Sequence, residues 1–333
     1  MTKKYIFKHN KNILFSLIIF VLVGCSNNPQ KPDSSYKEDG SPKLPKVLTE
    51  LEDEVLKIMY DIDSITGIEK AIEEMNSAAK ATEEMNGAAE ATSSEKTENN
   101  QEKPEKTSES EKEESKQKEK VDLQELIKEN KIIIPLLDAV EVKGSFVEST
   151  SPITDINQAW TKINDNVIEV HKKWNVLEAQ LTSINVPNTK LEEFEKTLDD
   201  LTTSIMNKEK LPSLKLSNEI TRITADFRSY FNGAADHGVY GMYYHIRGAI
   251  LFASSDNYSG ALQHLDEASR LGSSLRQNLI KQGSQDILQK FELSVEDLKK
   301  QLIDQNFYLS QIKAPIVIKN IKLIQDKFET QRK

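Results

Sequence analysis

Few side chains in this chain have the types and spacing that catalysis requires. Its sequence contains no HExxH or GxSxG motif, no phosphate-binding glycine loop and no cysteine cluster. A metal-binding or acid–base role is one interpretation of the histidines, but solvated histidines on helix surfaces are much commoner, and we favour that reading. We therefore expect a protein that is not an enzyme and has neither a metal site nor a cofactor. The histidines that follow the first 25 residues are His171, His237, His245 and His264.

Cys25 is the residue with the clearest chemistry, because it is the only cysteine among 333 residues and ends an apolar run that begins at Ile13. Four lysines precede this run, and the chain becomes polar directly after it. A basic start, a short apolar stretch and a small residue before the cleavage point predict a secretory signal peptide over residues 1–24. The end of the run, Leu22-Val23-Gly24-Cys25, resembles the bacterial lipobox, in which cleavage between Gly24 and Cys25 leaves an acylated cysteine as the new N-terminus.

Two other interpretations of this segment are weaker. A transmembrane anchor needs about 20 apolar residues, and the run provides only about half of that. A buried core thiol needs surrounding core, whereas Cys25 stands beside a Ser/Asn/Pro tract. A single cysteine also cannot form an internal disulfide in a secreted protein. We therefore expect a lipid anchor at Cys25.

The chain between the anchor and residue 91 divides into two parts. Residues 25–46 contain Pro29, Pro32, Pro42 and Pro45 and predict an extended tether. Residues 47–91 predict a helix, because Val47, Leu51, Val55, Ile58 and Ile62 share one helix face. Residues 71–80 and 81–90 form a tandem repeat with seven identical positions of ten. We favour a simple duplication in a weakly structured helix over a ligand-binding repeat.

Residues 92–120 contain no apolar side chain, so disorder is expected there. A solvated spacer is the favoured reading, and a segment that folds on a binding partner is the alternative. The apolar residues of the stretch 121–151 predict a lead-in segment that packs on the main domain, which we place at residues 152–333. The expected fold class is all-α, with a C-terminal multi-helix bundle after a lipid-anchored, largely disordered or single-helix N-terminal region.

Helical periodicity and capping signals divide the main domain into helices. Apolar residues recur in steps of four and three from Ile156 to Ile184, with Asp155 as the expected N-cap. Residues 239–271 predict a tight αα-hairpin. Further boundaries are predicted by a capping box at Thr189–Glu192, a break at Pro212-Ser213, a capping box at Ser294–Asp297 and a helix start at Pro315.

Tyr240, Tyr243, Tyr244 and Arg247 lie three and four residues apart on one predicted helix. Tyr and Arg are common anchors of protein interfaces, which makes these four residues a candidate binding site. The alternative, which we favour, is that the tyrosines fill the core or a groove with their hydroxyl groups at the surface. The burial of the three tyrosines distinguishes the two interpretations.

The net charge of −9 argues against nucleic acid as a partner, since phosphate binding needs a basic face. The leader ending in Leu22-Val23-Gly24-Cys25, the polar tether, the Glu/Lys/Ser-rich tract and the helical C-terminal domain together resemble the plasmid-encoded surface lipoproteins of Borrelia spirochaetes. The similarity is greatest to the virulent-strain-associated lipoproteins, with the Erp lipoproteins as neighbours. It implies attachment to the outer membrane, display on the cell surface, and binding of a host complement or extracellular-matrix protein.

The expected function is therefore non-catalytic host interaction in adhesion or immune evasion. A small-molecule carrier lipoprotein and a purely structural coat protein are the alternatives. A protein-binding module predicts an exposed apolar-aromatic patch on the bundle, a carrier predicts a closed apolar cavity, and a coat protein predicts neither.

Overall fold

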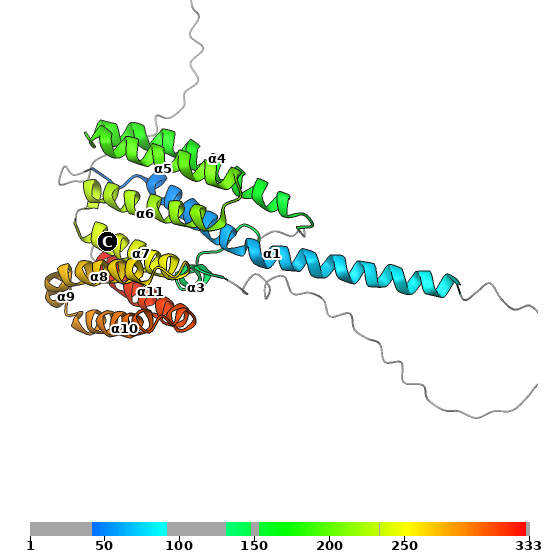
Figure 1. Ribbon diagram of the computed structural model, residues 1–333. Helices are drawn as coiled ribbons and strands as arrows, with labels where there is room; N and C mark the ends of the chain where they lie inside the picture. The colour runs from blue at the N-terminus through cyan, green and yellow to red at the C-terminus, as the bar shows by residue number, and fades with distance from the viewer. Residues whose placement is uncertain (1–41, 92–130, 148–152, 233, 331–333) are drawn as a thin grey trace, which may run out of the picture. The chain divides into compact units, whose positions relative to one another are not determined.

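The computed structural model describes residues 42–91, 131–147, 153–232 and 234–330, and its regular structure within these ranges is helical without strands. The predicted all-α fold with a C-terminal helical bundle is confirmed (Figure 1). The predicted signal peptide, Cys25, most of the tether and the predicted spacer lie outside the described residues. The helices are α1 (Lys46–Ala91), α3 (Ile134–Asp138), α4 (Ile156–Ser183), α5 (Asn188–Met206), α6 (Lys210–Asn232), α7 (Ala234–Ala253), α8 (Tyr258–Ser274), α9 (Arg276–Lys281), α10 (Gln285–Ile303) and α11 (Phe307–Thr330).

The helices pack in two groups that share one hydrophobic core. Helix α1 packs against α4 and α6, and α5 packs against α4 and α6. In the second group, α7 packs against α8 and α11, and α10 packs against α8 and α11. Extensive contacts between α6 and α7 join the groups, and the short helix α3 lies against both α1 and α11 (Figure 1).

Helix α1 is part of this core over its first half. Its apolar face, which includes Leu51, Val55, Ile58 and Ile62, is fully buried, and burial continues to Ala71. Residues 73–77 are exposed, and Figure 1 shows the rest of α1 extending past the neighbouring helices. The sequence predicted a separate helical segment at residues 47–91, and a lead-in segment at 121–151 that packs on a bundle domain at 152–333. In the structure, the first half of α1 and helix α3 share the core of α4–α11, because their apolar faces pack on those helices.

The first helix after residue 152 has the predicted register. The Asp155 carboxylate accepts a hydrogen bond from the Asn157 backbone N–H at 2.9 Å, which confirms the predicted N-cap of α4. The buried stripe of α4 includes Trp174, whose ring stacks on Phe194 of α5 at 4.0 Å between centroids and lies 6.0 Å from Phe227 of α6. These three rings fix the packing of α4, α5 and α6 on one another.

The predicted boundaries of α5 and α6 were wrong in two places. Pro187 occupies the N-cap position of α5 and no side chain caps this helix, so the capping box at Thr189 is not formed. Helix α6 begins at Lys210, which places Pro212 inside its first turn instead of in a break. A proline is tolerated there because the backbone N–H groups of the first turn have no helical partner.

The predicted boundaries of α10 and α11 were also wrong. Helix α10 is continuous through Ser294, whose hydroxyl donates to the Phe291 carbonyl at 2.8 Å instead of capping a new helix. Helix α11 begins at Phe307, where the Asn306 side chain accepts a hydrogen bond from the Leu309 N–H at 3.0 Å. Pro315 therefore lies within α11. The buried residues around it, which continue along the same face to Phe328, hold the helix together across the proline.

The predicted αα-hairpin is formed by α7 and α8. The Asn257 side chain caps α8 by accepting from the Gly260 N–H at 3.0 Å. Gly260 lies so close to Phe252 of α7 that a Cβ atom at this position would stand 2.4 Å from the Phe252 ring. A larger residue at this position would force the Phe252 ring to shift.

Candidate functional site

The four candidate residues on α7 do not form one exposed patch. Arg247 is only 5% exposed and Tyr243 is nearly as buried, whereas Tyr240 and Tyr244 are half-buried. Tyr240, Tyr243 and Arg247 line one cavity, and Tyr244 lines another. The structure thus places the three tyrosines in the walls of two cavities, with Tyr243 buried and Tyr240 and Tyr244 half-buried.

The first cavity, which we call the Arg247 cavity, has a volume of about 230 Å³. It lies where α1, α6, α7 and α11 meet the segment that follows α3. Its walls combine aliphatic and aromatic side chains with several charged groups. The residues that line it are Glu52, Asp53, Leu56, Val140, Val142, Thr221, Thr224, Tyr240, Tyr243, Arg247, Lys322 and Gln325.

The guanidinium of Arg247 is held by neutral acceptors. Its Nε donates to the Asn218 side-chain oxygen at 2.9 Å, and its Nη2 donates to the Thr221 hydroxyl at 2.8 Å. Asn218 is itself oriented, because its side-chain nitrogen donates to the Tyr244 carbonyl at 3.1 Å. Burial lowers the pKa of Arg247 to about 10, so the guanidinium keeps its positive charge at neutral pH.

A second buried arginine near this cavity has a carboxylate partner. Arg228 of α6 donates from its Nε to the two Glu52 oxygens at 2.9 and 3.1 Å, and its Nη2 also donates to Glu52. The guanidinium lies 3.7 Å from the centre of the Tyr240 ring, which adds a cation–π contact. The negative charge of Glu52 is therefore engaged by Arg228.

The two tyrosines of the Arg247 cavity are linked through α11. The Tyr243 hydroxyl donates to the Gln325 side-chain oxygen at 3.1 Å, and the Gln325 side-chain nitrogen donates to the Tyr240 hydroxyl at 3.2 Å. Burial raises the pKa of the Tyr243 hydroxyl far above its ordinary value, so this group remains protonated. The rings form fixed walls of the cavity.

Tyr244 belongs to a second cavity, of about 290 Å³, which also contains His264. Its hydroxyl donates to a Glu219 carboxylate oxygen at 2.9 Å. The Nδ1 atoms of His245 and His264 lie 3.1 Å apart, and burial lowers the pKa of His245 to about 4. Burial also lowers the pKa of His264, so the pair is neutral at pH 7 and shares one hydrogen bond.

The remaining histidines are isolated from this pair. His171 Nε2 lies 2.9 Å from the Thr202 hydroxyl, and His237 Nδ1 lies 3.3 Å from an Asp226 oxygen. Within the part of the chain that the structure describes, no three His, Cys, Asp or Glu side chains are grouped so that they could hold a metal ion.

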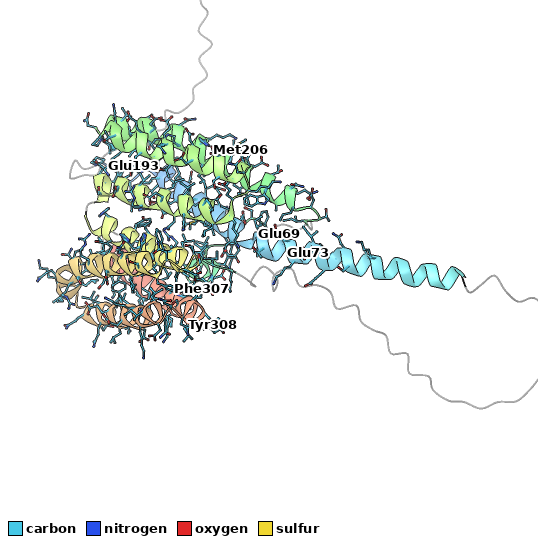
Figure 2. The ribbon with its side chains drawn as sticks, viewed as in Figure 1. Glu69, Glu73, Glu193, Met206, Phe307 and Tyr308 are labelled. Atoms are coloured by element: carbon cyan, nitrogen blue, oxygen red, sulfur yellow. The ribbon has the colours of Figure 1, made fainter. Side chains whose placement is uncertain are left out.

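The outer face of α11 carries an exposed apolar stripe that the sequence analysis missed. Tyr308 is 72% exposed, Ile312 and Ile316 are each 46% exposed, and Leu323 is 41% exposed. Their spacing places them on one side of the helix, opposite the buried face that contains Ala314, Ile318 and Ile321 among other residues. Figure 2 shows Tyr308 next to Phe307 at the start of α11. We refer to Tyr308, Ile312, Ile316 and Leu323 as the α11 stripe.

This stripe was missed because the predicted helix began at Pro315, which cut the pattern in two. The signal that could have revealed it is the spacing of four between Tyr308, Ile312 and Ile316, together with Asn306 as a capping residue.

None of the described helices combines the length and the hydrophobicity that a membrane span requires. No protein-family model matches this chain, and comparison with curated proteins and with solved structures gave no significant match.

Proposed function

We propose that this chain is a lipid-anchored bacterial surface protein of the Borrelia type, which binds a host complement or extracellular-matrix protein without catalysing a reaction. The observation that carries the binding proposal is the α11 stripe, whose four large apolar side chains are exposed on one helix face. Scattered exposed apolar residues are normal, but an aligned apolar-aromatic stripe on one helix is typical of a docking face.

The chemistry of the stripe supports a protein partner. Tyr308 is the most exposed large hydrophobic residue in the described part of the chain, and tyrosine is enriched among residues that dominate binding energy. Ile312 and Ile316 extend the apolar surface one and two turns further, and Lys319 adds a positive charge between Ile316 and Leu323. An apolar helix or groove on the partner, bordered by acidic groups, would complement this face.

The test substitutes glutamate for both Ile312 and Ile316 in the full-length protein. A host protein captured from serum or matrix by the wild-type chain is identified and purified, and its dissociation constant is measured by surface plasmon resonance. We expect the double variant to bind at least about tenfold more weakly, because two charges must be desolvated against an apolar partner surface.

Ile168→Glu on α4 is the matched control, since Ile168 is 44% exposed and lies outside the stripe. If the wild-type protein, the double variant and Ile168→Glu bound the host protein with equal affinity, the α11 stripe would not be the binding surface. The full chain is used because a fragment that starts at residue 121 would lack α1, which belongs to the core.

The anchor is tested separately with Cys25→Ala. We expect this variant to keep its leader and to partition into the aqueous phase of a detergent extraction, because acylation requires the cysteine and each buried methylene contributes about 0.8 kcal/mol of membrane affinity. Radiolabelled fatty acid should be incorporated into the wild-type chain alone. Detergent-phase partitioning that is the same for both proteins would contradict the lipoprotein assignment.

A further inference from the structure

We propose that the Arg247 cavity is a binding site for a small carboxylate, about the size of one amino acid, whose carboxylate forms a salt bridge with the buried Arg247 guanidinium. The inference does not rest on the α11 stripe or on the lipid anchor.

Arg247 lacks a directly bonded counter-charge within the described residues, and Glu52 acts on it only at longer range. Arg247 donates only to the neutral oxygens of Asn218 and Thr221, and no carboxylate oxygen of the described residues lies within 4.0 Å of its guanidinium nitrogens. A charge that is removed from water is normally paired, because burying it alone is strongly unfavourable. The same bundle follows this rule at Arg228, which is equally buried and binds Glu52 with both its Nε and Nη2.

Arg247 also has donors that no protein acceptor uses within the described ranges. Asn218 and Thr221 take one hydrogen each from Nε and Nη2 of Arg247, while its Nη1 makes no hydrogen bond with any residue in the described ranges. The side chain lines the cavity, so its remaining donors are available to an occupant. A guanidinium presents neighbouring N–H groups in a planar fork that matches the two oxygens of a carboxylate.

The size and the lining of the Arg247 cavity suit a small carboxylate. Its volume of about 230 Å³ corresponds to about eight water molecules, at about 30 Å³ each, and is smaller than typical drug-sized pockets of roughly 300–1,000 Å³. Leu56, Val140 and Val142 supply aliphatic surface, and the Tyr240 and Tyr243 rings are fixed through Gln325. A compact carboxylate with an apolar body fits these walls.

Asp53 is a carboxylate at the rim of the Arg247 cavity that could bind a second charged group of the ligand. Asp53 lines the cavity, is exposed, and forms no hydrogen bond or ion pair with the described part of the chain. Lys322, on the α11 side of the rim, is already paired with Asp326 at 2.8 Å. Asp53 is therefore able to pair with the ammonium group of a ligand whose carboxylate binds Arg247. These two charges are those of an α-amino acid.

The experiment titrates the purified full-length protein with three probes of the same carbon skeleton: 4-methylpentanoate, its neutral amide and leucine. Binding is followed by isothermal calorimetry and by two-dimensional NMR of the arginine Nε–H groups. We expect the carboxylate to bind at least about tenfold more tightly than the amide and to shift the Arg247 Nε–H signal, since the charge-assisted bond is the main source of affinity. If leucine bound more tightly than 4-methylpentanoate, its ammonium group would be assigned to a contact with Asp53. If 4-methylpentanoate bound more tightly, the ligand of the cavity would be a carboxylic acid without an amino group.

Arg247→Met should abolish carboxylate selectivity, and Arg270→Met is the matched control because the Arg270 side chain is 68% exposed. Arg247→Lys keeps the charge without the fork and should bind the carboxylate more weakly than the wild-type protein. If Arg247→Met fails to fold, the shift of the Arg247 Nε–H signal in the wild-type protein shows whether the carboxylate binds at Arg247. The proposal would be overturned if the carboxylate and the amide bound with equal affinity. It would also be overturned if neither carboxylate probe shifted the Arg247 Nε–H signal at about 10 mM, since a dissociation constant of about 10 mM corresponds to a binding free energy of only about −2.7 kcal/mol.

Discussion

Asp63→Asn is expected to lower the free energy of unfolding by about 3–5 kcal/mol, the usual effect of breaking a buried charge interaction. The buried Asp63 carboxylate accepts hydrogen bonds from the backbone N–H groups of Ile132, Ile133 and Ile134 at 2.7–3.0 Å. It also lies 3.3 Å from the Lys210 ammonium. Asparagine has nearly the same shape but loses the charge and turns one acceptor into a donor, which leaves backbone N–H groups unsatisfied.

The measurement is urea unfolding followed by circular dichroism at 222 nm. Asp200→Asn is the control, because Asp200 forms an exposed ion pair with Lys196 and such pairs contribute about 0.3–0.5 kcal/mol. Similar losses for the two variants would show that Asp63 does not fix the segment before α3 to α1.

Glu52→Gln is expected to cost about 3–5 kcal/mol as well, since it leaves the buried Arg228 guanidinium without a counter-charge. The double variant Glu52→Leu/Arg228→Met should lose less stability than Glu52→Gln, because removing both charges also removes the desolvation penalty of the pair. Urea unfolding of the single and double variants gives the coupling energy. A double variant that loses the sum of the two single effects would contradict a coupled buried pair.

Both predictions concern α1, whose role was only partly predictable from the sequence. The apolar spacing from Leu51 to Ile62 correctly predicted a helix with one apolar face. It did not reveal what covers that face, since α4 and α6 begin more than 90 residues further along the chain. Asp63 falls between apolar positions, and no local pattern indicates that it accepts backbone hydrogen bonds from residues about 70 positions away.

The candidate site was also partly predictable. The spacing of three and four correctly placed Tyr240, Tyr243 and Arg247 on one face of α7, because successive residues turn by about 100° around a helix. Tyr244 lies about 100° further round than Tyr243, which is why it faces a different cavity. That no carboxylate oxygen of the described residues lies within 4.0 Å of the Arg247 guanidinium nitrogens could not be predicted, since it depends on residues brought together from α1, α6 and α11.

Two of the wrong helix boundaries were predicted at prolines. Pro212 was predicted to break the chain and Pro315 to begin a helix, and both lie inside helices. At Pro212 the first turn needs no N–H donor, and at Pro315 the buried apolar face of α11 outweighs the lost backbone hydrogen bond. Local proline rules give way where a long apolar face is buried on both sides of the residue.

The tandem repeat lies in the part of α1 that follows its buried residues, so the number of copies sets the length of that part of the helix. The second copy, residues 81–90, follows Ala71, the last residue buried in the core among the α1 side chains that the structure describes, and the helix continues to Ala91. Each copy of ten residues lengthens such a helix by about 15 Å and rotates the direction in which the chain departs by about 80°. Gain or loss of a copy would therefore change both the length of α1 and the direction in which the chain leaves it, while the buried contacts from Leu48 to Ile68 stayed the same. The length of the distal part of α1 can thus vary in evolution without altering those contacts.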